Sequence, residues 1–118
     1  MTRTAVITGL GATTPIGGDV PTFWSNALKG VSGARTMEHE WVEELGLPVT
    51  FAAELAVPTA DVLSKVEQKR QDPGTQMATV AAREAWRDAG LEGVELDGDR
   101  LAVAFGTGIG GVWTLLDG

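Results

Sequence analysis

The hydrophobic pattern of this chain contains two short, almost continuous apolar runs. Residues 4–10 predict a first strand and residues 101–105 a second, and each run leads directly into a glycine-rich turn. A run that is apolar at nearly every position is typical of a strand covered on both faces. We therefore expect 101–105 to be a central strand of a larger sheet, and the chain to belong to the α/β class.

Helical spacing of apolar residues predicts a first helix over 20–29. Asp19 precedes it as a capping residue, and Gly30 follows it as a natural stop. The same spacing predicts a second helix over 60–70, with Thr59 in the capping position. The side chains expected to point inward from this second helix are Val62, Leu63 and Val66.

The longest helix is predicted over 73–89, because Asp72 suits the cap and Pro73 suits the first helical position. Gly90 ends it. Much of its surface is small, which lets such a helix approach a sheet or another helix closely. The small residues are Ala78, Ala81, Ala82, Ala85 and Ala89.

The segment 31–48 has the weakest pattern. A short helix is predicted over 38–45, and the side chains expected to point inward are Trp41, Val42 and Leu45. Residues 49–55 alternate between apolar and polar, which predicts a half-buried strand at a sheet edge or in a peripheral hairpin. No internal repeat or long linker interrupts the chain, so one domain, or part of one, is expected.

Composition narrows the classes of function. The formal net charge of −7 argues against a general nucleic-acid binder, so we expect no nucleic-acid partner. The apolar runs are far shorter than the roughly 20 residues that span a bilayer, and no signal peptide is recognisable, so we expect no membrane partner. Without cysteine the chain has no thiolate metal site and no cysteine nucleophile. We expect no metal ion and a cytoplasmic location.

The glycine turn over 106–111 satisfies G-x-G-x-x-G, and three readings stay open. It is a dinucleotide site with backbone N–H groups facing a pyrophosphate, although the earlier turn over 9–14 lacks the third glycine. Alternatively, the glycines supply positive φ or allow a close backbone approach. In the third reading, which takes most of its weight from a family resemblance, the turn is one wall of an acyl pocket, with Ile109 as its only large apolar side chain.

Taken in order, the motifs resemble the N-terminal part of the β-ketoacyl-acyl-carrier-protein synthases, most closely the elongating type (synthase II) of bacterial fatty acid synthesis. The matching pieces are Val6 to Gly17, Phe23-Trp24 with Leu28-Lys29-Gly30, Gly33, the helix from Ala81 to Leu91, and Gly106 to Gly111. They span nearly the whole chain in the family's order and spacing. No single motif is decisive, but the set is quite specific.

The resemblance implies a partial thiolase-like fold, the N-terminal part of an αβαβα layered architecture, with residues 1–118 forming the first part of a ketosynthase domain. The family transfers acyl groups: it condenses an acyl thioester with malonyl-carrier protein and releases carbon dioxide. A cysteine is the nucleophile, and two histidines stabilise the transition states. The implied partners are acyl carrier protein and acyl and malonyl thioesters, in a homodimeric full-length enzyme without a cofactor.

Two features of the family transfer to this chain. Ile109, with Gly108, matches the acyl-binding position, although an ordinary core isoleucine is an equal alternative. Lys69 and Arg70 match basic positions that dock the acidic carrier protein in the family. Lys65 is adjacent and completes the predicted docking site, although Val66 stands where the family often has another lysine. The alternative is a solvated helix end whose cations favour the helix dipole.

No catalytic residue is expected in this chain. It lacks cysteine, and its one histidine, His39, is expected on the solvated surface. Arg83 is interpreted as an exposed helix residue, and Glu84 and Asp88 form no recognisable acid–base arrangement. We therefore expect the N-terminal fragment of a synthase II, inactive by itself. The rival hypotheses are a non-catalytic, chain-length-controlling partner of a polyketide ketosynthase, a nucleotide-binding module built on the 106–111 turn, and a small stable domain with an unknown binding role.

Overall fold

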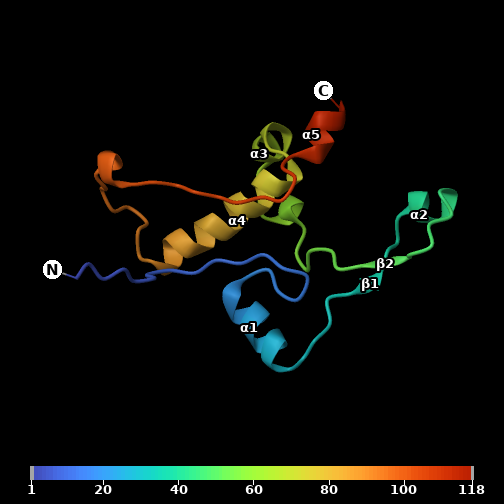
Figure 1. Cartoon of the computed structure of the whole chain (residues 1–118), viewed down its shortest axis with the longest axis horizontal. Coiled ribbons are helices and arrows are strands. Elements are labelled where there is room, and N and C mark those ends of the chain that lie inside the picture. Colours follow the sequence, from blue (N-terminus) through green and yellow to red (C-terminus); the bar gives the residue numbers. More distant parts are fainter. Residues whose placement is uncertain (1, 118) are drawn as a thin grey trace. The chain divides into compact units, whose positions relative to one another are not determined.

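The computed structural model describes residues 2–117; Met1 and Gly118 lie outside the described residues. The chain divides into two units, one formed by Thr13–Val57 and the other by the segment up to Ala12 together with the chain from Pro58 onward. In chain order the elements are α1 (Val20–Leu28), β1 (Arg35–Thr36), α2 (Glu40–Glu44), β2 (Phe51–Ala52), η1 (Thr59–Asp61), α3 (Lys65–Arg70), α4 (Pro73–Asp88), η2 (Gly98–Arg100) and α5 (Val112–Asp117) (Figure 1).

Helix α1 confirms the first helical prediction. The Asp19 side chain accepts a hydrogen bond of 2.7 Å from the backbone N–H of Thr22, which satisfies one of the free donors of the first turn. After the helix, Gly30 adopts a φ of +68°, a conformation that glycine takes without strain. The local sequence therefore sets both ends of α1.

The rest of the Thr13–Val57 unit contains a minimal antiparallel sheet, in which Arg35 of β1 lies opposite Ala52 of β2. This confirms a strand within 49–55, although it is only two residues long and is not half-buried as expected, because Phe51 is 61% exposed. Helix α2 confirms the helix predicted over 38–45, but its packing differs from the expectation. Val42 is buried, whereas Trp41 and Leu45 are exposed. A single helical turn can bury only a narrow stripe.

The prediction of one helix over 60–70 capped by Thr59 is wrong. Thr59 begins the short turn η1, and α3 begins only after Ser64. Ser64 and Glu67 form a capping box, and such reciprocal hydrogen bonds define a helix start. Because the helix starts at Lys65 and not at residue 60, the inward-facing positions differ from the expectation. Leu63 is buried, as expected, while Val62 and Val66, which were expected to point inward, are exposed.

Helix α4 is the longest element and follows the prediction closely. The Asp72 side chain accepts a hydrogen bond of 2.9 Å from the backbone N–H of Thr75, and Pro73 opens the helix. Gly90 follows with a φ of +70°. Val80 is its buried residue.

The segment before Ala12 lies against α4 at close range (Figure 1). A Cβ on Gly9 would overlap the backbone of Ala85, and one on Gly11 would overlap the backbone of Ala81. The alanines of α4 therefore allow another segment to pack closely, as expected, and that segment is the N-terminal one. Glycine is required here because another backbone occupies the place of its side chain.

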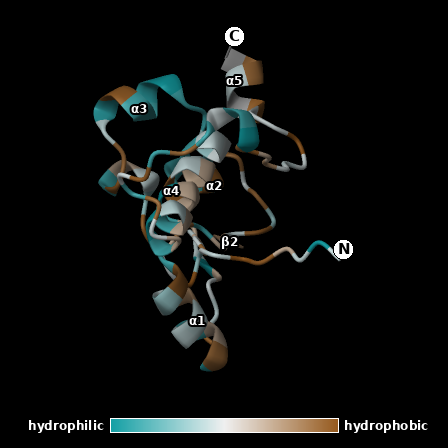
Figure 2. Ribbon diagram, turned by 90° about the vertical axis from the view of Figure 1, so that its left-hand side faces the viewer, coloured by the Kyte–Doolittle hydropathy of each residue, from teal (hydrophilic) through white to brown (hydrophobic). Residues whose placement is uncertain are grey.

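Both strand predictions, for 4–10 and for 101–105, are wrong for the described structure: neither segment forms a strand. A strand needs a neighbouring strand to pair with, and within residues 2–117 no strand pairs with either segment. Their apolar side chains are exposed, with Ile7 at 82% and Val103 at 78%. Figure 2 shows hydrophobic residues along the extended N-terminal segment.

We predict that Gly11→Ala destabilises the protein by about 1–3 kcal/mol, since the added methyl group displaces the segment from α4. The measurement is urea unfolding of the full-length gene product. Gly98→Ala is the matched control, because a Cβ at Gly98 meets no atom within 4 Å. Equal unfolding midpoints for the two variants would contradict the close packing.

Candidate functional site

Helix α3 begins with a network of three hydrogen bonds between Ser64 and Glu67. The Glu67 carboxylate accepts from the Ser64 backbone N–H at 2.9 Å and from the Ser64 hydroxyl at 2.7 Å. In return, the Ser64 hydroxyl oxygen accepts from the Glu67 backbone N–H at 3.4 Å. One carboxylate oxygen is thereby committed to the start of the helix.

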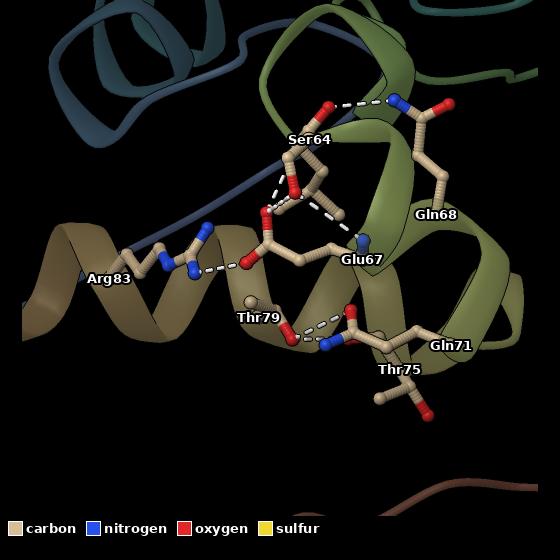
Figure 3. A network of polar contacts seen from close by, with 8 residues as sticks. Ser64, Glu67, Gln68, Gln71, Thr75, Thr79 and Arg83 are labelled. Carbon is tan, nitrogen blue, oxygen red and sulfur yellow. Dashed lines mark hydrogen bonds and ion pairs between the residues drawn. The ribbon is translucent and has the colours of Figure 1, made fainter.

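The other carboxylate oxygen of Glu67 pairs with the Arg83 guanidinium of α4 (Figure 3). The Arg83 pairing, with the Ser64 hydrogen bonds second, lowers the pKa of Glu67 from 4.5 to about 2. The Glu67 side chain is 26% exposed. It therefore stays ionised at neutral pH and holds a cation against it.

Glutamine side chains fasten the rest of α3. The Gln76 side chain of α4 donates to the backbone carbonyl of Gln68 at 3.1 Å and to that of Gln71 at 3.0 Å. The Gln68 side chain donates to the Leu63 carbonyl at 2.7 Å. Thr79 of α4 donates to the Gln71 side chain at 3.2 Å, as Figure 3 shows. These bonds fix the backbone of α3 on α4.

The predicted docking residues Lys65, Lys69 and Arg70 all lie on α3 and are exposed. Lys65 and Lys69 are four positions apart, so they project from neighbouring turns of one helical face. None of the three cations forms an ion pair within residues 2–117. Lys69 and Arg70 also occupy the last turn, where cations favour the helix dipole, so the structure agrees with both readings.

The 106–111 turn needs glycine at two of its positions. Gly110 has a φ of +82°, and a Cβ on Gly111 would lie 2.7 Å from the Asp72 carboxylate. A hydrogen bond from the Thr75 backbone N–H holds the pKa of that carboxyl below its usual value, so it is ionised. A negative charge beside the turn disfavours a pyrophosphate, which argues against the dinucleotide reading.

The predicted acyl-binding residues are not brought into a pocket. Ile109 is 86% exposed, and a Cβ on Gly108 would meet no atom within 4 Å. A groove of about 300 Å³ does lie beside the turn, lined by Phe105, Thr107 and Gly111 among others, but its lining omits Ile109 and Gly108. The assignment of Ile109 and Gly108 as acyl-binding residues therefore stays a prediction.

Three residues of α4 have contacts that the sequence analysis missed. Arg83 is an exposed helix residue, as predicted, and is paired with Glu67. The Glu84 carboxylate accepts from the Ala12 backbone N–H at 2.8 Å, and the Asp88 carboxylate accepts from the Leu10 backbone N–H at 2.9 Å. The sequence does show that Glu84 and Asp88 are one helical turn apart. This spacing is similar to that between alternate N–H groups of an extended segment, such as those of Leu10 and Ala12.

His39 lies in the Thr13–Val57 unit and is exposed, as predicted. Its Nε2 lies 2.6 Å from a Glu54 carboxylate oxygen, and its ring stacks on Trp41 with centroids 5.2 Å apart. These contacts explain the position of the histidine without a catalytic role. Across the part of the chain that the structure describes, no group of three or more acidic, histidine or cysteine residues is arranged to hold a metal ion.

Comparison with known proteins identifies the family. Residues 2–117 match the family model for the beta-ketoacyl synthase N-terminal domain. The chain is 45% identical over 113 residues to a 3-oxoacyl-[acyl-carrier-protein] synthase 2 of Staphylococcus aureus, covering 95% of this chain and 27% of that protein. It is 37% identical over 105 residues to the protein of the same name in Mycobacterium bovis, covering 89% of this chain and 25% of that one.

The chain therefore belongs to the beta-ketoacyl synthase family and corresponds to its N-terminal domain. It spans about a quarter of the length of the curated relatives that it matches. Among residues 2–117 there is no helix of the length and apolar character that a membrane span requires.

We predict that Glu67 remains ionised between pH 3.5 and 5, where ordinary glutamates titrate. Since its pKa is depressed, the stabilisation from the Arg83 pairing is complete well above pH 4.5, declines progressively as the pH falls below that value, and is gone below about pH 2. The measurement is the carboxyl carbon shift of Glu67 in ¹³C-labelled full-length protein, assigned with Glu67→Gln.

Arg83→Gln should raise the Glu67 pKa toward its ordinary value, because the largest cause of the shift is removed, whereas Arg83→Lys retains a cation. A wild-type Glu67 that titrates near 4.5 would show that the pairing does not exist in solution.

Proposed function

We propose that this chain forms the N-terminal part of a 3-oxoacyl-[acyl-carrier-protein] synthase 2, which condenses acyl groups with malonyl-carrier protein in fatty acid synthesis. The observation that carries the proposal is the identity of 45% over 95% of the chain to a protein of that name. Within the proposal, the chain contributes the first part of a thiolase-like, layered domain to a cytoplasmic homodimer.

Two features of the structure support a place in a larger layered fold. The segments 4–10 and 101–105 are apolar and lie outside any strand, and their large apolar side chains are exposed. Only three hydrophobic side chains in the described part of the chain are buried: Val42, Leu63 and Val80. Exposed extended segments of this kind are covered in stable proteins, so additional strands and helices are expected against them.

Within this function, the exposed face of α3 docks the carrier protein. Three cations without ion-pair partners on a protein of net charge −7 create a local positive field, which attracts an acidic partner at low salt. Gly108 and Ile109 form one wall of the acyl pocket once the missing layers enclose the turn. The nucleophile lies in polypeptide outside this chain, because the chain itself contains no cysteine. The chain alone is therefore inactive.

We predict that the full-length gene product catalyses the condensation, and that the double substitution Lys69→Glu with Arg70→Glu raises the KM for malonyl-carrier protein about tenfold. Each exposed charge contact is worth up to about 1 kcal/mol, and both contacts become repulsive. The increase should shrink in 0.5 M salt, which screens the surface charges. The measurement is steady-state condensation of acyl- and malonyl-carrier proteins.

Arg3→Glu with Arg100→Glu is the matched control, because it changes the net charge equally at exposed sites away from α3. An equal KM increase in the control would show that the net charge of the protein, and not docking at α3, causes the effect. A full-length protein without turnover would overturn the proposed reaction and favour the non-catalytic partner.

We predict that Ile109→Phe lowers kcat/KM for a long acyl primer relative to a short one by about tenfold or more, because one added methylene in an apolar pocket already discriminates at that level. The control is Val49→Phe, which introduces a phenylalanine at a position that is 51% exposed and lies in the other unit. An unchanged ratio in Ile109→Phe would remove Ile109 from the acyl pocket.

A further inference from the structure

The basic helix α3 has an acidic residue in the middle of its sequence. Glu67 lies between Lys65 and Lys69 in sequence, and three positions before Arg70. On a helix, residues three apart are neighbours, so a free Glu67 carboxylate is within reach of Arg70. Such a pair would remove one of the three cations from the surface, and an acidic partner would meet a weaker field.

The structure shows Glu67 bound elsewhere. One carboxylate oxygen accepts from Ser64, at 2.9 Å from the backbone nitrogen and 2.7 Å from the hydroxyl, and the other faces the Arg83 guanidinium (Figure 3). The side chain therefore points toward α4 and the start of its own helix. Arg70 forms no ion pair within the described residues.

Resting on the proposed docking of carrier protein at α3, we infer that Arg83 is a positioning residue for this interaction, which acts by neutralising Glu67 and holding it away from Arg70. Arg83 then contributes to carrier recognition through Glu67 and not through a contact of its own. A glutamate side chain is ionised at neutral pH, so the Glu67 carboxylate needs a permanent counter-charge if it is not to pair with Arg70. Arginine supplies one.

The inference predicts a suppressor relationship. In the full-length gene product, Arg83→Gln should raise the KM for malonyl-carrier protein about threefold to fivefold at low salt, with kcat little changed, since Glu67 is released toward Arg70. Adding Glu67→Gln should restore the KM to within about twofold of wild type, because no carboxylate remains to be held. Glutamine retains the hydrogen bonds of the capping box, so α3 keeps its start.

Three alternatives give other results. If Arg83 touches the carrier protein directly, or only stabilises the fold, the double variant stays as impaired as Arg83→Gln, and the inference is overturned. Arg87→Gln on the same helix changes the net charge equally, and a matching KM increase there also overturns it. Arg83→Lys should stay close to wild type. Thermal unfolding of every variant shows whether the KM follows stability.

The Lys69→Glu and Arg70→Glu variant separates this inference from the proposed function. If its KM is unchanged, carrier protein does not dock on α3, and both fail together. If its KM rises while Arg83→Gln has no effect, docking stands and only the role of Arg83 is lost.

Discussion

The close approach of Gly11 to the backbone of α4 is the constraint on which the larger unit depends. Without a Cβ, the extended segment comes near enough for its backbone N–H groups at Leu10 and Ala12 to reach carboxylates one helical turn apart. At 3.6 residues per turn, Arg83 lies on the opposite face of α4 from Ala81. That second face holds α3. One helix therefore organises two segments that are far apart in the chain, and each face is specified by its own residues.

Local chemistry was readable from the sequence, and pairing between distant segments was not. The caps Asp19 and Asp72 act within three residues of themselves, so α1 and α4 followed directly from the pattern. The segments 4–10 and 101–105 have strand composition, but a strand exists only with a neighbouring strand. For α3, the pattern placed the cap at Thr59, whereas the reciprocal bonds of Ser64 and Glu67 determine the start of the helix.

For the candidate site too, the sequence predicts the local features, and the contacts between distant residues appear only in the structure. The exposure of Lys65, Lys69 and Arg70 follows from a short polar helix beside a buried Leu63. The pairing of Glu67 with Arg83 joins residues sixteen positions apart, and no periodicity within one helix reports it. The sequence shows the spacing of Glu84 and Asp88, but only the structure shows that they accept hydrogen bonds from the backbone of a distant segment.

The two faces of α4 also bind acidic side chains in different ways. Glu84 and Asp88 lie on the face that binds the N-terminal segment, where their carboxylates accept hydrogen bonds from backbone N–H groups. On the α3 face, the negative charge of Glu67 meets Arg83 instead. An acidic molecule approaching α3 therefore encounters cations whose nearest acid is already compensated, even though the whole chain is strongly negative. Local arrangement, and not net charge, decides which partner such a surface attracts.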